Sequence, residues 1–381
     1  MPISSDIRFD RNELSGAFGD LGTDFPLLVG MILAAGLDTT SVLVVYGLMQ
    51  VFTGLTYGMP MPVQPLKAMA VIVITQKVSG SVLAGGGLAI GAVMLLLSVT
   101  GLIDWLARAV PRSVVRGIQL GLGLQLASLA LKEYVPAAGA SGYVLAAVAF
   151  VVTLALLGNR RVPPAPFVIA LGVAYAFLFR LGGANFGGAL GLHIPQVHAP
   201  SWSDVATGFF LLALPQIPLS LGNSILATRQ VASDLFPQKN VTTRRISLTY
   251  SLMNLVSPWF GGVPVCHGSG GIAGHYAFGG RTGGSVVIYG LFYLTLGLFL
   301  SGGFQQVIEL FPKPVLGIIL LFEAIALLRL TRDTAGSTVD FTVALLVGLI
   351  AFTLPYGYVI GLIVGWIVAT LANRKALKLE G

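Results

Sequence analysis

The chain has 381 residues, of which 55% are hydrophobic and only 10% are charged, and its formal net charge is +7. A soluble domain has about 25% charged residues, so this chain lacks the polar side chains to cover a water-facing surface. Apolar runs recur from end to end, which excludes a soluble domain on a single anchor. Because the basic residues lie between these runs, the positive charge indicates membrane orientation and not a nucleic-acid partner.

The apolar runs predict fourteen membrane-spanning segments in an all-α polytopic protein. They are expected near residues 15–36, 40–57, 64–77, 82–105, 113–131, 141–158, 164–181, 205–228, 243–258, 267–278, 284–301, 313–329, 338–354 and 357–373. Two of them, 64–77 and 267–278, are too short to cross the bilayer alone, since a spanning helix needs about 20 residues. The polar start, Met1–Glu13, does not have the pattern of a cleavable signal peptide.

The distribution of Lys and Arg tests this number of segments. With fourteen spans both termini lie on one side, and 17 of the 22 Lys and Arg fall on that side while four fall opposite. A miscount of one span would scramble this division. Since basic residues are enriched in cytoplasmic loops, we expect an integral protein of the cell or inner membrane with both termini in the cytoplasm. The remaining basic residue, Lys67, lies inside a predicted span.

Two Pro-rich segments resemble each other and indicate an internal repeat. Residues 57–67 read Tyr-Gly-Met-Pro-Met-Pro-Val-Gln-Pro-Leu-Lys, and residues 260–270 read Phe-Gly-Gly-Val-Pro-Val-Cys-His-Gly-Ser-Gly. We align Pro60 with Pro264, which also aligns a preceding glycine in each segment. The two segments therefore mark equivalent positions in two halves of the chain.

A polar residue precedes each Pro-rich segment at a similar distance. Asp20 lies 40 residues before Pro60, and Asn223 lies 41 residues before Pro264. This spacing predicts two halves of seven spans each, and an odd number of spans inserts the halves in opposite orientations. The predicted plan is a seven-plus-seven inverted repeat, which is common in secondary transporters. The halves are expected to cover residues 1–190 and 191–381.

Each Pro-rich stretch leads into a short helix, which predicts an anion site. Proline disfavours helix for the residue before it, and non-helical backbone at membrane depth persists only when it is buried in protein or lines a cavity. Half-helices beginning near Pro65 and His267 then meet at the bilayer midplane with their N-termini facing each other. Their unpaired amides and positive dipole ends favour an anion between them.

Three charged residues are candidates for binding or coupling. Lys67 sits where a charge is expensive and usually functional, so we interpret it as a counter-charge for an oxyanion or as a partner of Asp20 that holds helices together. Asp20 is a candidate proton carrier, and it would touch a dianion directly only when protonated. Glu323, in an apolar run, is a second coupling candidate or a group at an interface between domains.

Neutral groups complete the candidate site. The amides of Gln64, Gln216 and Asn223 can bind an oxyanion without a full charge or hydrogen-bond between helices. His267 titrates near neutrality when unperturbed, and Ser269 starts a Gly-rich turn that either binds an anion or only caps a helix. The candidate substrate-binding residues are Asp20, Gln64, Lys67, Gln216, Asn223, His267, Gly268, Ser269 and Gly270.

Several activities lack a supporting motif in the sequence. There is no phosphate-binding Gly-x-x-x-x-Gly-Lys-Ser/Thr motif, no His or Cys at metal-ligand spacing and no pairing of a nucleophile with a base. ATP-driven transport, a metal site, a cofactor and enzymatic activity are therefore not predicted. The single cysteine, Cys266, excludes an internal disulfide and is interpreted as a packing residue.

Five segments resemble the molybdate transporter family, a branch of the sulfate-permease-like superfamily, which shares its fold with nucleobase transporters. They are residues 18–22, 62–67, 218–224, 264–271 and 275–283. The resemblance implies two inverted sets of seven helices divided into a core and a gate domain, and uptake of the tetrahedral oxyanion molybdate. Many sulfate permeases carry a cytoplasmic C-terminal regulatory domain; this sequence ends soon after its last apolar run, so no such domain is expected.

The leading functional hypothesis is secondary active transport of molybdate between the two half-helices, by displacement of one domain against the other. Sulfate or another tetrahedral oxyanion is the nearest alternative substrate. An anion channel on the same scaffold is an alternative mechanism, and a nucleobase substrate is less favoured. The expected partners are the anion and the lipid bilayer, and assembly into a homodimer is left open.

Overall fold

The fold is mostly helical, and the computed structural model describes residues 7–103, 105, 110–156, 164–179 and 190–374. Up to residue 179 the elements are α1 (Arg11–Ala17), α2 (Leu21–Ala35), α3 (Thr39–Tyr57), β1 (Val63–Pro65), α4 (Lys67–Gln76), α5 (Gly80–Thr100), α7 (Arg112–Leu129), η1 (Ala130–Tyr134), η2 (Val135–Ala138), α8 (Gly139–Leu156) and α9 (Pro164–Phe179). From residue 202 they are α10 (Trp202–Gly208), η4 (Phe209–Ala213), α11 (Leu214–Leu219), η5 (Ser220–Ala227), α12 (Thr228–Leu235), α13 (Thr243–Val256), η6 (Ser257–Phe260), β2 (Val265–His267), α14 (Ser269–Ala277), α15 (Gly284–Phe299), α16 (Ser301–Leu310), α17 (Lys313–Arg329), η7 (Leu330–Thr334), α18 (Thr338–Thr353) and α19 (Gly357–Asn373).

Many of these helices are apolar enough for a membrane. Within the described residues, five continuous helical stretches have the length and hydropathy to cross one: Thr39–Tyr57, Gly80–Thr100, Arg112–Leu156, Trp202–Leu235 and Lys313–Thr334. Shorter apolar helices are Asp24–Ala35, Lys67–Gln76, Phe167–Phe179, Gly284–Phe299, Thr338–Thr353 and Gly357–Ala372. Length and composition thus agree with a polytopic membrane protein, and the number fourteen stays a prediction.

Two features of the helices were not foreseen. The first expected span is two helices, α1 and α2, separated at residues 18–20, where Gly19 approaches α14 so closely that an added Cβ would lie 2.6 Å from the carbonyl oxygen of Gly274. An additional helix, α16, lies between α15 and α17. It is short and mixes apolar with polar residues, so it lacks the long apolar run by which spans are recognised.

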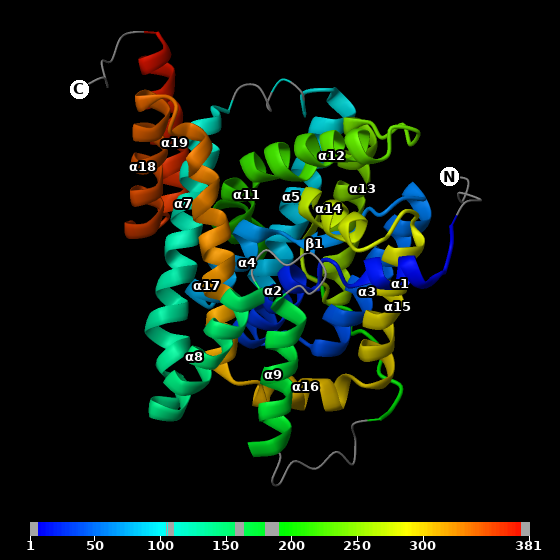
Figure 1. The fold of residues 1–381 in the computed structure, drawn as a ribbon. Helices are drawn as coiled ribbons and strands as arrows, with labels where there is room; N and C mark the ends of the chain where they lie inside the picture. The colour runs from blue at the N-terminus through cyan, green and yellow to red at the C-terminus, as the bar shows by residue number, and fades with distance from the viewer. Residues whose placement is uncertain (1–6, 104, 106–109, 157–163, 180–189, 375–381) are drawn as a thin grey trace.

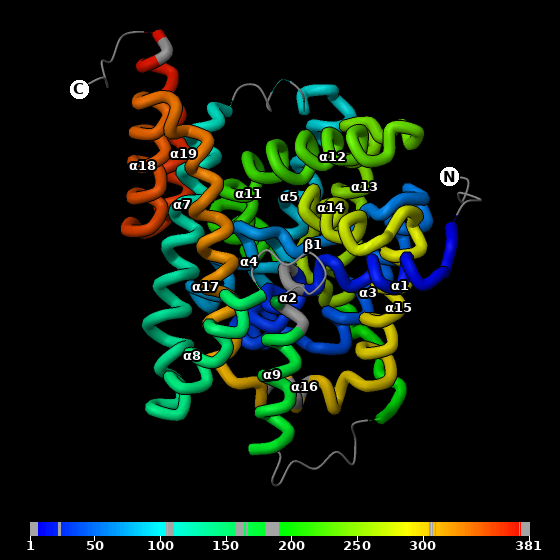
Figure 2. Tube along the Cα trace, viewed as in Figure 1, coloured from blue at the N-terminus to red at the C-terminus, as the bar shows by residue number. Residues whose placement is uncertain are grey.

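The helices pack in two groups. In the first helix group, made of α1–α5 and α10–α15, α3 packs along α15, and α5 packs against α10 and α13. In the second helix group, made of α7–α9 and α17–α19, α7 contacts α17, α18 and α19. Figures 1 and 2 show α7, α8, α17, α18 and α19 at the left of the view, α9 in the lower middle, and α1, α3, α13, α14 and α15 at the right. Contacts of α4 with α7 and of α2 with α17 connect the groups.

An ion cluster ties the second helix group at one end. Arg112 Nη2 lies 2.5 Å from Asp333 Oδ2, and Arg116 donates to both oxygens of that carboxylate. The two arginines on α7 thus bind Asp333 on η7 and hold these two elements together.

The two short strands form one antiparallel ladder, in which Val63, Gln64 and Pro65 face His267, Cys266 and Val265. This register corrects the sequence alignment. Each half-helix starts two residues after its strand, so Pro62 is equivalent to Pro264, and the predicted pairing of Pro60 with Pro264 was wrong by two residues. Two differences of one residue each cause the error. Four residues separate Gly58 from β1 whereas three separate Gly261 from β2, and the left-handed glycine that corresponds to Gly58 is Gly261 and not Gly262.

Amide side chains hold each strand from the preceding long helix. Gln50 on α3 donates from Nε2 to the Val63 carbonyl at 2.7 Å and accepts from the Val63 amide at 2.9 Å. Asn254 on α13 makes the same pair of bonds with Val265, at 2.7 and 2.9 Å. Buried backbone groups must find partners, and these two side chains supply them where helical bonding is interrupted.

We predict that Asn254→Leu destabilises the protein because it removes both partners of Val265. Each orphaned buried group costs about 1–3 kcal/mol, so the melting temperature in detergent should fall by several degrees. Gln230→Leu is the matched control, since Gln230 is exposed on α12 and the hydrogen bond recorded for its side chain in the described part of the chain goes to Asp234, one turn away. Equal melting temperatures for Asn254→Leu and the control would contradict this role.

Candidate functional site

A cavity of about 210 Å³ lies where the two half-helices begin. Eight of the nine candidate residues line it: Gln64, Lys67, Gln216, Asn223, His267, Gly268, Ser269 and Gly270. The ninth, Asp20, lies behind Gln64. Leu219, Ser224, Cys266 and Leu330 complete the lining. Residues from four separate parts of the sequence therefore meet at one site.

The N-terminus of α14 is open to this cavity. Its first residue is Ser269, and among the described residues no side chain caps it. The first backbone bond of the helix runs from the Ile272 amide to the Gly268 carbonyl, so the amides of the preceding turn point out of the helix end. A Cβ added at Gly270 would meet nothing within 4 Å. The helix thus presents free donors and its positive dipole end to open space.

The N-terminus of α4 is different, because the protein caps it. Gln216 on α11 accepts from the amides of Ala68 and Met69 at 2.9 and 3.4 Å. The amide nitrogen of Gln216 donates to Ser220 at 3.2 Å, and Ser220 bonds to the Tyr250 hydroxyl. Gln216 therefore acts as an interhelical hydrogen-bonding group, one of the two alternatives that its sequence left open.

Lys67 is the first residue of α4 and lies where Ser269 lies in α14. Its Nζ is 3.3 Å from Glu323 Oε1 on α17. The Lys67 side chain is 33% exposed and that of Glu323 is 16% exposed. The ammonium thus pairs with a carboxylate of the second helix group, and not with Asp20, while part of it still faces the cavity.

Asp20 acts on the cavity through Gln64. The amide nitrogen of Gln64 donates to both carboxylate oxygens of Asp20, at 2.8 and 2.6 Å, and Asp20 is buried. Gly268 approaches this amide so closely that an added Cβ would overlap the Gln64 side chain. Asp20 and Gly268 therefore fix the position of Gln64 at the wall of the cavity.

His267 is fully buried and belongs to the frame of the site. Its Nε2 lies 2.7 Å from Thr249 Oγ1, and its ring stacks edge-on against Tyr57. Its carbonyl accepts a hydrogen bond from Thr228 at 3.2 Å. These contacts tie β2 to α13 and α12.

One buried carboxylate escaped sequence analysis. Asp24 on α2 accepts from the Tyr46 hydroxyl at 2.5 Å and from the Tyr289 hydroxyl at 3.4 Å. The Tyr46 hydroxyl also lies 2.5 Å from the Val63 carbonyl, which links Asp24 to β1. A signal was available, because Asp24 follows Asp20 by four residues and so shares its helix face, in a segment where acidic residues are costly.

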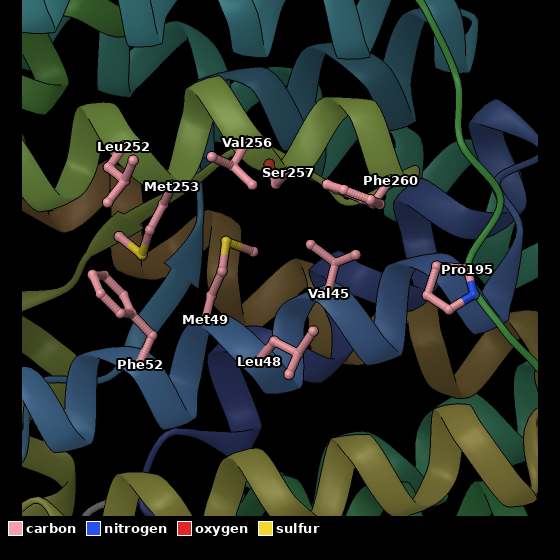
Figure 3. Close-up of a pocket in the computed structure, with 10 residues that line it drawn as sticks. All are labelled: Val45, Leu48, Met49, Phe52, Pro195, Leu252, Met253, Val256, Ser257 and Phe260. Atoms are coloured by element: carbon pink, nitrogen blue, oxygen red, sulfur yellow. The ribbon is translucent and has the colours of Figure 1, made fainter.

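A larger cavity, of about 340 Å³, does not fit an anion. It lies between α3 and α13, and Figure 3 shows side chains such as Val45, Met49, Phe52 and Met253 directed into it. Its only hydroxyl-bearing lining residue is Ser257. An anion there would lose hydration without gaining donors.

Comparison with protein families identifies relatives of this chain. The model of the family described as "Molybdate transporter of MFS superfamily" matches residues 12–126 and 208–327. Molybdate transporter 2 of Arabidopsis thaliana is 34% identical in an alignment 396 positions long, which covers 90% of this chain and 83% of that protein. Molybdate transporter 1 of Arabidopsis thaliana is 35% identical over 368 residues, with 84% and 80% covered.

Comparison with solved structures shows the fold. The transmembrane domain of the cyanobacterial bicarbonate transporter BicA matches with a TM-score of 0.68 at 17% identity, covering 97% of this chain and all of that one. The family match and the two molybdate transporters confirm the resemblance inferred from the five sequence segments. The chain is an integral multi-pass membrane protein that belongs to the molybdate transporter family.

Proposed function

We propose that this chain carries molybdate across the membrane as a secondary transporter and binds it in the cavity between α4 and α14. The observation that carries the proposal is the uncapped N-terminus of α14 opening into that cavity beside Lys67. The relatives named as molybdate transporters support the substrate. Membership of a transporter family also favours transport over an enzymatic reaction.

The geometry supports a division of labour in binding. The amides of Ser269 and Gly270 and the Ser269 hydroxyl supply directed donors at the positive end of α14. Lys67, which lines the same cavity, supplies the full positive charge. Directed donors together with a positive charge suit a tetrahedral dianion, whose oxygens point in several directions.

Transport then requires the two helix groups to move against each other, with the first as core and the second as gate. Among the ion pairs recorded for the described residues, the Lys67–Glu323 pair joins the groups. A bound dianion would compete with Glu323 for Lys67. Glu323, with Asp20 as the alternative, is the proposed coupling residue.

The proposed topology is a seven-plus-seven inverted repeat with halves at residues 1–190 and 191–381. Both termini lie in the cytoplasm of a cell or inner membrane in this scheme. Its support is the division of basic residues in the sequence and the antiparallel pairing of the two strands that precede the half-helices.

Gly270→Leu should abolish molybdate uptake without unfolding the protein, because the new side chain fills the open cavity and meets no neighbour at its Cβ. The measurement is saturable uptake and counterflow in proteoliposomes, with tungstate and sulfate as competitors. Gly336→Leu is the control, since Gly336 is also free of neighbours within 4 Å but lies outside the cavity. Normal uptake by folded Gly270→Leu protein would move the site elsewhere.

Lys67→Gln should weaken molybdate binding and also lower the melting temperature, because it leaves the partly buried Glu323 without its partner. A hydrogen bond to a charged group contributes about 1.5–3 kcal/mol, so the Kd should rise at least about tenfold. The double variant Lys67→Gln/Glu323→Gln should recover stability but not affinity, as measured by melting and by equilibrium binding. Recovery of both would make Lys67 a purely structural residue.

Glu323→Gln should remove the response of uptake to an imposed pH gradient while counterflow continues, because an amide cannot take up and release the coupled proton. Accumulation in proteoliposomes with an acidic exterior measures the uptake driven by the pH gradient, and exchange at equal pH measures counterflow. Gradient-driven uptake at the wild-type level in Glu323→Gln would exclude this residue and leave Asp20.

A further inference from the structure

A third cavity, of about 630 Å³, lies apart from the cavity between α4 and α14 (the transport cavity). Four segments form it: the chain before α1, the end of α3, the α12–α13 connection and the α14–α15 connection. Its lining residues are Ile7, Arg8, Gly58, Gln238, Lys239, Arg281 and Thr282. Three of these are basic and none is acidic. Converging cations from separate segments make this cavity a place of positive potential.

Backbone carbonyls and an aromatic ring hold the guanidinium of Arg281 in position. Its Nη1 donates to the carbonyls of Tyr276 and Gly280 at 2.6 and 2.8 Å, and its guanidinium carbon lies 3.7 Å from the centre of the Tyr276 ring. Neither Arg281 nor Arg8 has an ion pair recorded in the described part of the chain. The positive charge of Arg281 is thus oriented in advance, which reduces the entropy lost on binding a ligand.

The loop beside Arg281 is fixed from its other side. Glu13, which is 1% exposed, accepts from the backbone amides of Arg281, Thr282 and Ser285 at 2.9–3.0 Å. Its carboxylate is therefore engaged by the loop's amides. Thr282 Oγ1 accepts from the amides of Arg8 and Gly284 at 3.2 and 3.1 Å. Both acceptor positions of that hydroxyl are used, which leaves its proton as a donor.

We propose that this cavity is a second anion site, which binds a phosphate-type tetrahedral group through Arg8, Arg281 and the Thr282 hydroxyl. Guanidinium groups match the oxygens of such a group with two parallel hydrogen bonds. The volume is about 630 Å³ against about 210 Å³ for the transport cavity, so it also admits the remainder of a larger ligand. The group comes either from the headgroup of an anionic lipid or from a free anion in solution.

The test uses the full chain with the transport cavity closed by Gly270→Leu, so that any anion effect arises elsewhere. The variants in that background are Arg8→Gln/Arg281→Gln and the control Arg244→Gln, which removes an exposed charge outside the cavity. The probes are inorganic phosphate in detergent, and vesicles of phosphatidylcholine with and without phosphatidic acid. The readout is the concentration dependence of the melting temperature.

Stabilisation by inorganic phosphate that weakens at least about tenfold in the double variant, and not in the control, supports a site for a free anion. Stabilisation only by phosphatidic acid, with the same loss, supports a lipid headgroup. No stabilisation by either probe, or equal loss in Arg244→Gln, overturns the proposal. If the double variant fails to fold, Arg8→Gln alone decides, because its side chain is exposed. Molybdate uptake by the double variant with Gly270 intact should be unchanged, so failure here is separable from failure of the proposed transport.

Discussion

The structure depends on satisfying backbone groups where helices are interrupted inside the protein. The chain loses helical bonding at β1 and β2, which are buried, and buried backbone groups must find partners. The strands β1 and β2 bond to each other, and Gln50 and Asn254 bind the first residue of each from a neighbouring long helix. This arrangement fixes where α4 and α14 begin, and so it fixes the walls of the cavity.

The two half-helices use their N-termini differently. Gln216 already occupies the amides of α4, whereas those of α14 stay open to the cavity. The first residue of each helix complements this difference, because Lys67 brings a charge to the capped end and Ser269 brings a small donor to the open end. In the proposed site, directed hydrogen bonds therefore come from α14 and the net charge comes from α4.

The ion pair of Lys67 with Glu323 joins α4 of the first helix group to α17 of the second. A partly desolvated pair is costly to break unless another partner takes its place, and in the proposed mechanism a dianion at Lys67 is such a partner. Under that proposal, one ammonium group links substrate binding to the contact between the helix groups.

The sequence by itself determined the membrane class, the two short helices and eight of the twelve residues that line the cavity, because apolar runs, prolines and rare polar residues are local signals. It did not determine how the two Pro-rich segments align, since the connection that precedes the strand is one residue shorter in the second half. It also could not assign Lys67 to Glu323, Asp20 to Gln64 or the cap of α4 to Gln216. Those choices depend on which helix faces meet, and only tertiary packing decides that.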